Sequence, residues 1–97
     1  MYVILTSKPG QFKTEIGDAL QPVEAYDYLF CGRKRAHFVI AHLTRDVKIT
    51  IVDESSPQVV NHVPSKFLAK FETVEAARQE LKSLTRFGGM DISLMKC

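Results

Sequence analysis

Cysteine is scarce in this sequence, and long apolar runs are absent. The two cysteines, Cys31 and Cys97, are too few for a disulfide scaffold and do not form a Cys-x-x-Cys pair. No stretch approaches the roughly 20 apolar residues that a membrane-spanning helix needs. Residues 1–10 also have no basic leader before their apolar run. We therefore expect a cytoplasmic protein with reduced thiols and no membrane partner.

The sequence also lacks the short motifs that mark common enzyme classes. It contains no glycine-rich phosphate loop, no nucleophile elbow and no His-Glu-x-x-His zinc motif. Charge is nearly balanced, since 13 basic and 11 acidic residues leave a formal net charge of +2. That balance requires no polyanionic partner. An enzyme whose catalytic residues are dispersed along the chain is not excluded.

The length and composition predict a globular fold. With 97 residues, 45% of them hydrophobic, the chain is expected to form a single domain over residues 1–97. Alternating apolar patterns predict an antiparallel or mixed sheet of about five to seven strands, including strands at 1–6, 35–43, 47–53, 58–63 and 92–96. The strand at 1–6 is apolar on both faces, which is typical of a central strand. The fold class is therefore predicted as α+β.

Residues 73–86 carry the clearest helical pattern in the chain. Thr73 is a suitable N-cap, and Gly88 and Gly89 are expected to end the helix. Apolar residues recur at helical spacing at Val74, Ala77, Leu81 and Leu84. A helix of this length is marginal alone, so we expect its apolar stripe to pack on the sheet.

Residues 22–30 fit two structures. A helix would begin well with Pro22 in its first turn, whereas alternating aromatic residues favour a strand that forms a hairpin with 35–43 across Gly32-Arg33-Lys34. We favour the strand. The alternative is a ferredoxin-like βαββαβ fold with a second helix near 22–31. Lys8-Pro9-Gly10 after a first strand, with a late helix and a last strand, resembles small dimeric α+β barrel proteins, a resemblance that implies this helix but no function.

The most concentrated charge lies at Arg33, Lys34 and Arg35. These residues could hold phosphate or another anion, with Tyr26 and Tyr28 as stacking surfaces nearby. A solvated hairpin tip is the simpler interpretation, because short basic runs are common in turns.

A second set of candidates could form a small-molecule pocket between helix and sheet. Asp27 would need partners or a raised pKa if it pointed inward. His62 lies near the end of the strand expected at 58–63, and Lys66 follows that strand after Pro64. Cys31 could be a nucleophile beside the basic run, although we expect it to be packed at a strand end.

We expect no metal and no cofactor. His37 and His42 are five residues apart, so on a strand they face opposite sides of the sheet. His62 has no cysteine or carboxylate partner at the spacing of a zinc motif.

Three functions remain open, and we rank them in this order. The first is a non-catalytic interaction or accessory module that contacts another protein or forms a dimer. The second is a small-molecule-binding protein or enzyme. The third is a nucleic-acid-binding domain that uses residues 33–35, which is possible but not favoured.

Overall fold

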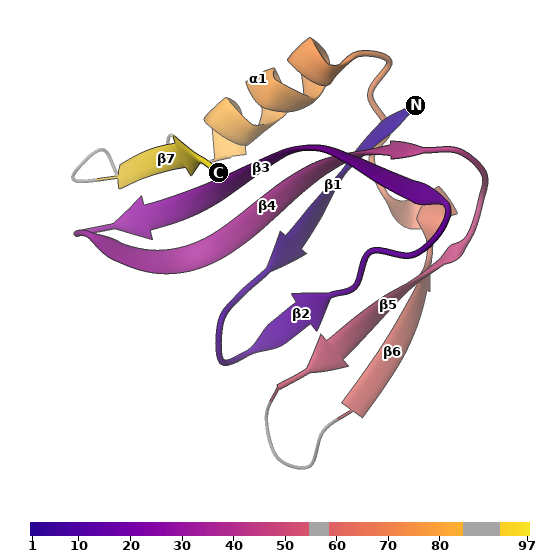
Figure 1. Cartoon of the computed structure of the whole chain (residues 1–97), viewed down its shortest axis with the longest axis horizontal. Helices are drawn as coiled ribbons and strands as arrows, with labels where there is room; N and C mark the ends of the chain where they lie inside the picture. The colour runs from indigo at the N-terminus through magenta and orange to yellow at the C-terminus, as the bar shows by residue number, and fades with distance from the viewer. Residues whose placement is uncertain (55–58, 85–91) are drawn as a thin grey trace.

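The described part of the chain contains seven β-strands, one short 3-10 helix and one α-helix (Figure 1). The computed structural model describes residues 1–54, 59–84 and 92–97. The elements are β1 (Tyr2–Ser7), β2 (Phe12–Thr14), β3 (Leu20–Phe30), β4 (Arg33–Leu43), β5 (Lys48–Asp53), β6 (Val59–Pro64), η1 (Ser65–Phe67), α1 (Val74–Leu84) and β7 (Ile92–Lys96). The strands form two antiparallel sheets, and α1 packs on the four-stranded one, so the predicted α+β fold is confirmed.

Residues 22–30 belong to a strand, as favoured from the sequence. β3 and β4 form a long antiparallel hairpin, so the ferredoxin-like alternative with a second helix near 22–31 is wrong. The turn consists of Cys31 and Gly32, whose φ angles of 51° and 74° are those of a type I′ turn. It begins one residue before the predicted connection and is one residue shorter. Pro22 is tolerated because the β3–β4 register shifts directly after it.

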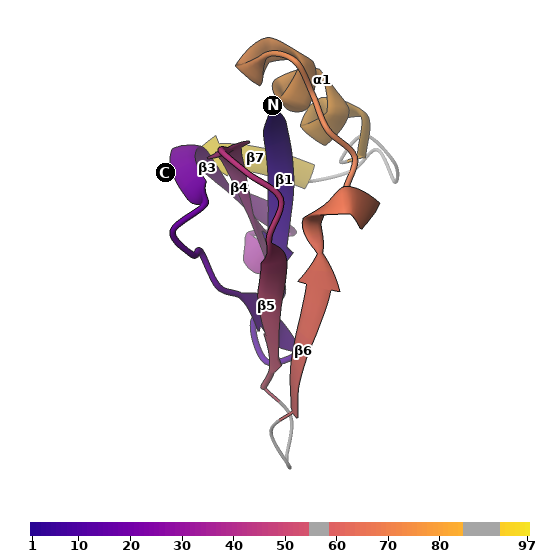
Figure 2. The same cartoon turned by 90° about the vertical axis from the view of Figure 1, so that its right-hand side faces the viewer.

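The strands form two sheets, with the orders β1-β4-β3-β7 and β2-β5-β6. Figures 1 and 2 show α1 on one side of the four-stranded sheet and β5 and β6 toward the other. β1 is an edge strand, so the prediction that it is central is wrong. Both of its faces are apolar because both are covered: Tyr2 and Ile4 contact the helix cluster, while Val3 and Leu5 belong to the core between the sheets.

The helix predicted at 73–86 is confirmed over the described residues as α1, and residues 85 and 86 fall outside them. The Thr73 hydroxyl caps it by accepting a hydrogen bond from the Ala76 amide at 3.0 Å. Ala77 and Leu81 are fully buried against the sheet, and burial of a leucine contributes roughly 1.5–3 kcal/mol. Leu84, expected on the same face, is 54% exposed. The expected stop at Gly88 and Gly89 falls outside the described residues.

The strand predicted at 92–96 is confirmed as β7, which pairs antiparallel with β3. This places the end of β7 beside the middle of β3, where the candidate site lies. No helix within the described ranges has the length and apolar character needed to cross a membrane.

Candidate functional site

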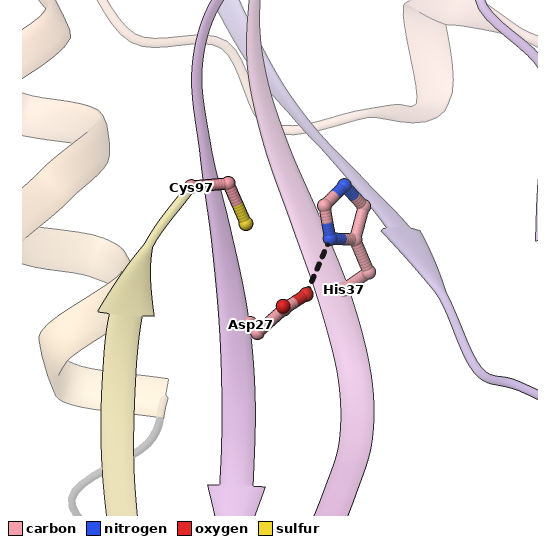
Figure 3. Close-up of side chains that lie close together, drawn as sticks. All are labelled: Asp27, His37 and Cys97. Carbon is pink, nitrogen blue, oxygen red and sulfur yellow. Dashed lines mark hydrogen bonds and ion pairs between the residues drawn. The ribbon is translucent and has the colours of Figure 1, made fainter.

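Three side chains that can bind a metal ion meet on one face of the four-stranded sheet (Figure 3). Asp27 lies on β3 directly opposite His37 on β4, and opposite residues of an antiparallel pair share a face. Cys97 follows β7 and is held beside β3 because its amide donates a hydrogen bond to the Ala25 carbonyl at 2.8 Å. The cluster therefore draws one residue from each of three adjacent chain segments.

The distances within this cluster are short. His37 Nδ1 lies 2.7 Å from Asp27 Oδ1, and Lys34 Nζ lies 3.2 Å from the same oxygen. One potential ligand atom of each residue, including the Cys97 sulfur, lies within 4.8 Å of the other two. The Asp27 and His37 side chains are 29% and 30% exposed, and Cys97 is exposed. The cluster is open to solvent, so an ion or small molecule can reach it.

The Asp27 carboxylate carries the negative charge of the cluster. The hydrogen bond from His37 lowers the pKa of Asp27 below its usual value, and Lys34 lowers it further, so this carboxylate is ionised at neutral pH. Partial desolvation and the negative charge of Asp27 raise the pKa of the Cys97 thiol. A thiol in this setting is a poor nucleophile. A bound metal ion would reverse this effect, because a coordinating thiol is deprotonated outright.

The donor set fits a transition metal better than Mg²⁺ or Ca²⁺. Thiolate and imidazole are ligands for Zn²⁺ and related ions, while the hard cations prefer oxygen alone. Ligand atoms around tetrahedral Zn²⁺ lie roughly 3.3–3.8 Å apart. The observed spread of up to 4.8 Å therefore needs side-chain shifts of about 1 Å. Three protein ligands would leave one coordination position open.

The predicted basic run is divided by the structure. Arg33, Lys34 and Arg35 are all exposed at the start of β4, and of these three only Lys34 contacts the cluster. Arg35 instead borders a hollow of about 360 Å³ with Tyr28.

The other predicted site residues do not join Asp27. Tyr26 and Tyr28 alternate with it along β3 and face the helix side, where Tyr26 hydrogen-bonds Glu24. His62 on β6 is exposed and lies 3.2 Å from Thr50 Oγ1. Lys66 lies in η1, so both belong to the neighbourhood of the three-stranded sheet. The suggested pocket of Asp27, His62 and Lys66 between helix and sheet does not form, because strand alternation turns Asp27 away from the helix.

The prediction for the two histidines of β4 is confirmed, and the prediction for Cys31 is wrong. His37 and His42 do face opposite sides, since His37 pairs with Ser7 while His42 pairs with and lies against Tyr2. The expectation that Cys31 is packed at a strand end is wrong, because it is exposed in the hairpin turn. Sequence spacing gave no sign that Cys97 would join His37 and Asp27.

A second charged group that the sequence did not reveal lies on the helix side of the same strands. The Glu24 side chain is only 6% exposed and accepts two hydrogen bonds from Arg78, at 2.6 and 2.7 Å. Lys96 Nζ lies 3.0 Å from the carboxylate, and the Tyr26 hydroxyl donates to it at 3.0 Å. Arg78 above all lowers the pKa of Glu24 to about 2. Because the carboxylate is fully partnered, this group fastens α1 to β3 and β7 and is not free to bind a ligand.

Comparisons of the chain with protein-family models, with curated proteins and with solved structures found no significant match. A function therefore has to be inferred from the geometry of the Asp27–His37–Cys97 cluster.

Proposed function

We propose that this chain binds a transition-metal ion of the Zn²⁺ class through Asp27, His37 and Cys97. One observation carries the proposal: carboxylate, imidazole and thiol atoms from three adjacent segments lie within 4.8 Å of one another. Asp27 and His37 lie on strands paired over several residues, and Cys97 directly follows the paired strand β7, so the ligands are attached to a rigid frame. Rigid elements place metal ligands more precisely than loops do.

Charge supports the same proposal. A divalent ion would balance the charges of its two anionic ligands, the Asp27 carboxylate and the Cys97 thiolate, with the neutral imidazole of His37 as third ligand and the Lys34 ammonium beside them. The exposed position of the cluster suits an ion that is exchanged or that meets a small molecule. The proposal needs a reduced thiol, which agrees with the cytoplasmic location that we expect.

Cobalt titration tests the proposal, because Co²⁺ replaces Zn²⁺ in such sites and its bond to a thiolate absorbs strongly in the near ultraviolet. Purified protein without a histidine tag is titrated with Co²⁺ under reducing conditions. We expect thiolate-to-cobalt absorption that saturates at one equivalent and is displaced by Zn²⁺. Asp27→Asn and His37→Ala should weaken Co²⁺ binding by at least tenfold.

The two exposed cysteines provide a matched control pair. Cys97→Ser should abolish the thiolate-to-cobalt band, whereas Cys31→Ser should leave it unchanged, since Cys31 lies in the hairpin turn. A band that survives Cys97→Ser, or no band in the unaltered protein, would refute the metal site.

Self-association through β6 is a second candidate function, and it retains the interaction module ranked first from the sequence. β6 is an edge strand without a charged side chain. Val59 and Val60, on its opposite faces, are 47% and 52% exposed, and Phe67 nearby is 71% exposed. An uncharged apolar edge is a template for pairing with another strand. Two copies could therefore align their β6 strands antiparallel without charge repulsion.

Sedimentation over a range of protein concentrations tests this second candidate. We expect a dimer that Val60→Lys converts to monomer, because a lysine on an edge strand opposes pairing. Val23→Lys is the matched control, since Val23 is 47% exposed but lies on β3 of the other sheet. A monomer at every concentration would remove dimerisation through β6.

A further inference from the structure

Lys34 holds a position next to the proposed metal that the metal itself does not explain. Its ammonium lies 3.2 Å from Asp27 Oδ1, and its side chain is 46% exposed. A metal ion bound to Asp27 would take over the negative charge that now pairs with Lys34. The ammonium would then lie within a few ångströms of the metal, where it could donate a hydrogen bond to a further ligand.

The charge balance of the loaded site favours one kind of ligand. A divalent ion, the Asp27 carboxylate and the Cys97 thiolate sum to zero, so the Lys34 ammonium would place a positive charge beside the open coordination position. An anionic oxygen ligand at that position would pair with this ammonium and accept a hydrogen bond from it.

A groove begins at His37 and gives the ligand a direction. It has a volume of about 460 Å³, and besides His37 it is bordered by Leu5, Val39, Ile16, Ser7 and Thr14. The first three are aliphatic, so the groove offers apolar contact to a short chain, with hydroxyl groups beside it. A group bound between the metal and Lys34 could extend its tail along this surface.

We propose that the metal-loaded protein binds a small aliphatic carboxylate, with its carboxylate between the metal and Lys34 and its tail in the groove that begins at His37. This inference rests on the proposed metal site. It adds the substrate class of that site, a monocarboxylate with a short apolar chain.

Butyrate, acetate and butanamide serve as probes for the cobalt-loaded protein. Butyrate should change the visible cobalt spectrum in a saturable manner, and neutral butanamide should not. Butyrate should bind about fivefold more tightly than acetate, because its two extra methylene groups are partly buried in the groove. Equal affinity of acetate and butyrate would overturn the assignment of the groove, and a response to butanamide would overturn the need for a carboxylate.

Lys34→Met separates the two proposals. Cobalt should bind this variant as tightly as the unaltered protein or more tightly, since the competing ammonium on Asp27 is gone, while butyrate affinity should fall roughly tenfold. Lys34→Arg should restore much of the butyrate affinity. Lys48→Met removes an equal charge from β5 of the other sheet and should change neither affinity.

The outcomes are distinguishable. Failure of cobalt to bind would remove the metal site and the carboxylate proposal together. Cobalt binding with butyrate affinity unchanged by Lys34→Met would overturn the carboxylate proposal alone.

Discussion

Replacing Glu24 with glutamine should destabilise the protein in a way that depends on pH. The change keeps the shape of the side chain but removes the charge that holds Arg78, at 2.6 and 2.7 Å, and Lys96, at 3.0 Å. Because the Glu24 side chain is only 6% exposed, the amide of the introduced glutamine cannot replace these contacts with hydrogen bonds to water. Arg78 and Lys96, at 40% and 61% exposed, can turn back to solvent, which limits the loss.

The pKa of Glu24 determines how much the free energy of unfolding should fall in Glu24→Gln. Lowering it from 4.5 to about 2 corresponds to about 3 kcal/mol at 1.36 kcal/mol for each pH unit. Solvent screening of the partly exposed Arg78 and Lys96 reduces this figure. We therefore expect Glu24→Gln to lower the free energy of unfolding by about 2 kcal/mol at pH 7, a large fraction of the roughly 5–10 kcal/mol typical of a domain this size.

The sign of the pH dependence follows from the same pKa. Above about pH 5 the carboxylate is ionised in both the folded and the unfolded chain, and its full contribution is present. As pH falls from 4.5 toward 2, the unfolded chain takes up the proton first, so this contribution is lost. The difference between the two proteins should therefore shrink to less than half at pH 3 and nearly vanish at pH 2.

Urea unfolding, followed by far-ultraviolet circular dichroism at pH 7, 5, 4 and 3, measures this difference. Asp27, whose pKa is also lowered, is present in both proteins, so its contribution cancels in the difference between their free energies of unfolding. Glu72→Gln removes an exposed carboxylate and should change stability by less than about 0.5 kcal/mol. A destabilisation by Glu24→Gln that is as large at pH 3 as at pH 7 would refute the ion-pair explanation.

Three further predictions concern the core, the hairpin turn and the metal. Leu81→Ala should lower the free energy of unfolding, measured in urea, by about 2–5 kcal/mol, since Leu81 is fully buried. Leu84→Ala, at a position 54% exposed, should lower it by less than about 1 kcal/mol. Equal losses for the two variants would contradict the packing of α1. Gly32→Ala should lower the free energy of unfolding by about 1–2 kcal/mol because Gly32 has a φ of 74°. Cys31→Asn should leave the free energy of unfolding unchanged or raise it, because asparagine is favoured in a type I′ turn. A larger loss for Cys31→Asn than for Gly32→Ala would argue against that turn. Zinc at a hundredfold excess over its dissociation constant should raise the free energy of unfolding by about 2.7 kcal/mol. Thermal unfolding measures this gain, and a chelator or Cys97→Ser should abolish it.

The sequence determined the parts of the fold that depend on local pattern. The apolar spacing of Val74, Ala77 and Leu81 defined α1, because a helix of that length needs a buried stripe to be stable. Alternating aromatic residues on either side of Asp27 favoured a strand over a helix at 22–30, and β3 confirms it. Local periodicity reports which residues share a face, so the α+β class could be predicted from it.

Periodicity does not report which layer a face meets. The first strand was predicted to be central because both of its sides are apolar. In the structure β1 is an edge strand, and its two faces contact α1 and the core between the sheets. The Glu24 pair with Arg78 joins residues 54 positions apart. No local spacing predicts such a contact, because it depends on where α1 packs.

The candidate metal site depends on a detail of pairing that only the tertiary structure decided. From the turn, Leu29 pairs with Lys34, but Tyr28 then pairs with Ala36, so Arg35 is an extra residue on β4. Without this bulge Asp27 would lie opposite Ala36, and His37 would face the other side of the sheet. Cys97 joins the pair because β7 docks beside β3. The ligand types are written in the sequence, but their meeting follows from one register shift and one long-range strand pairing.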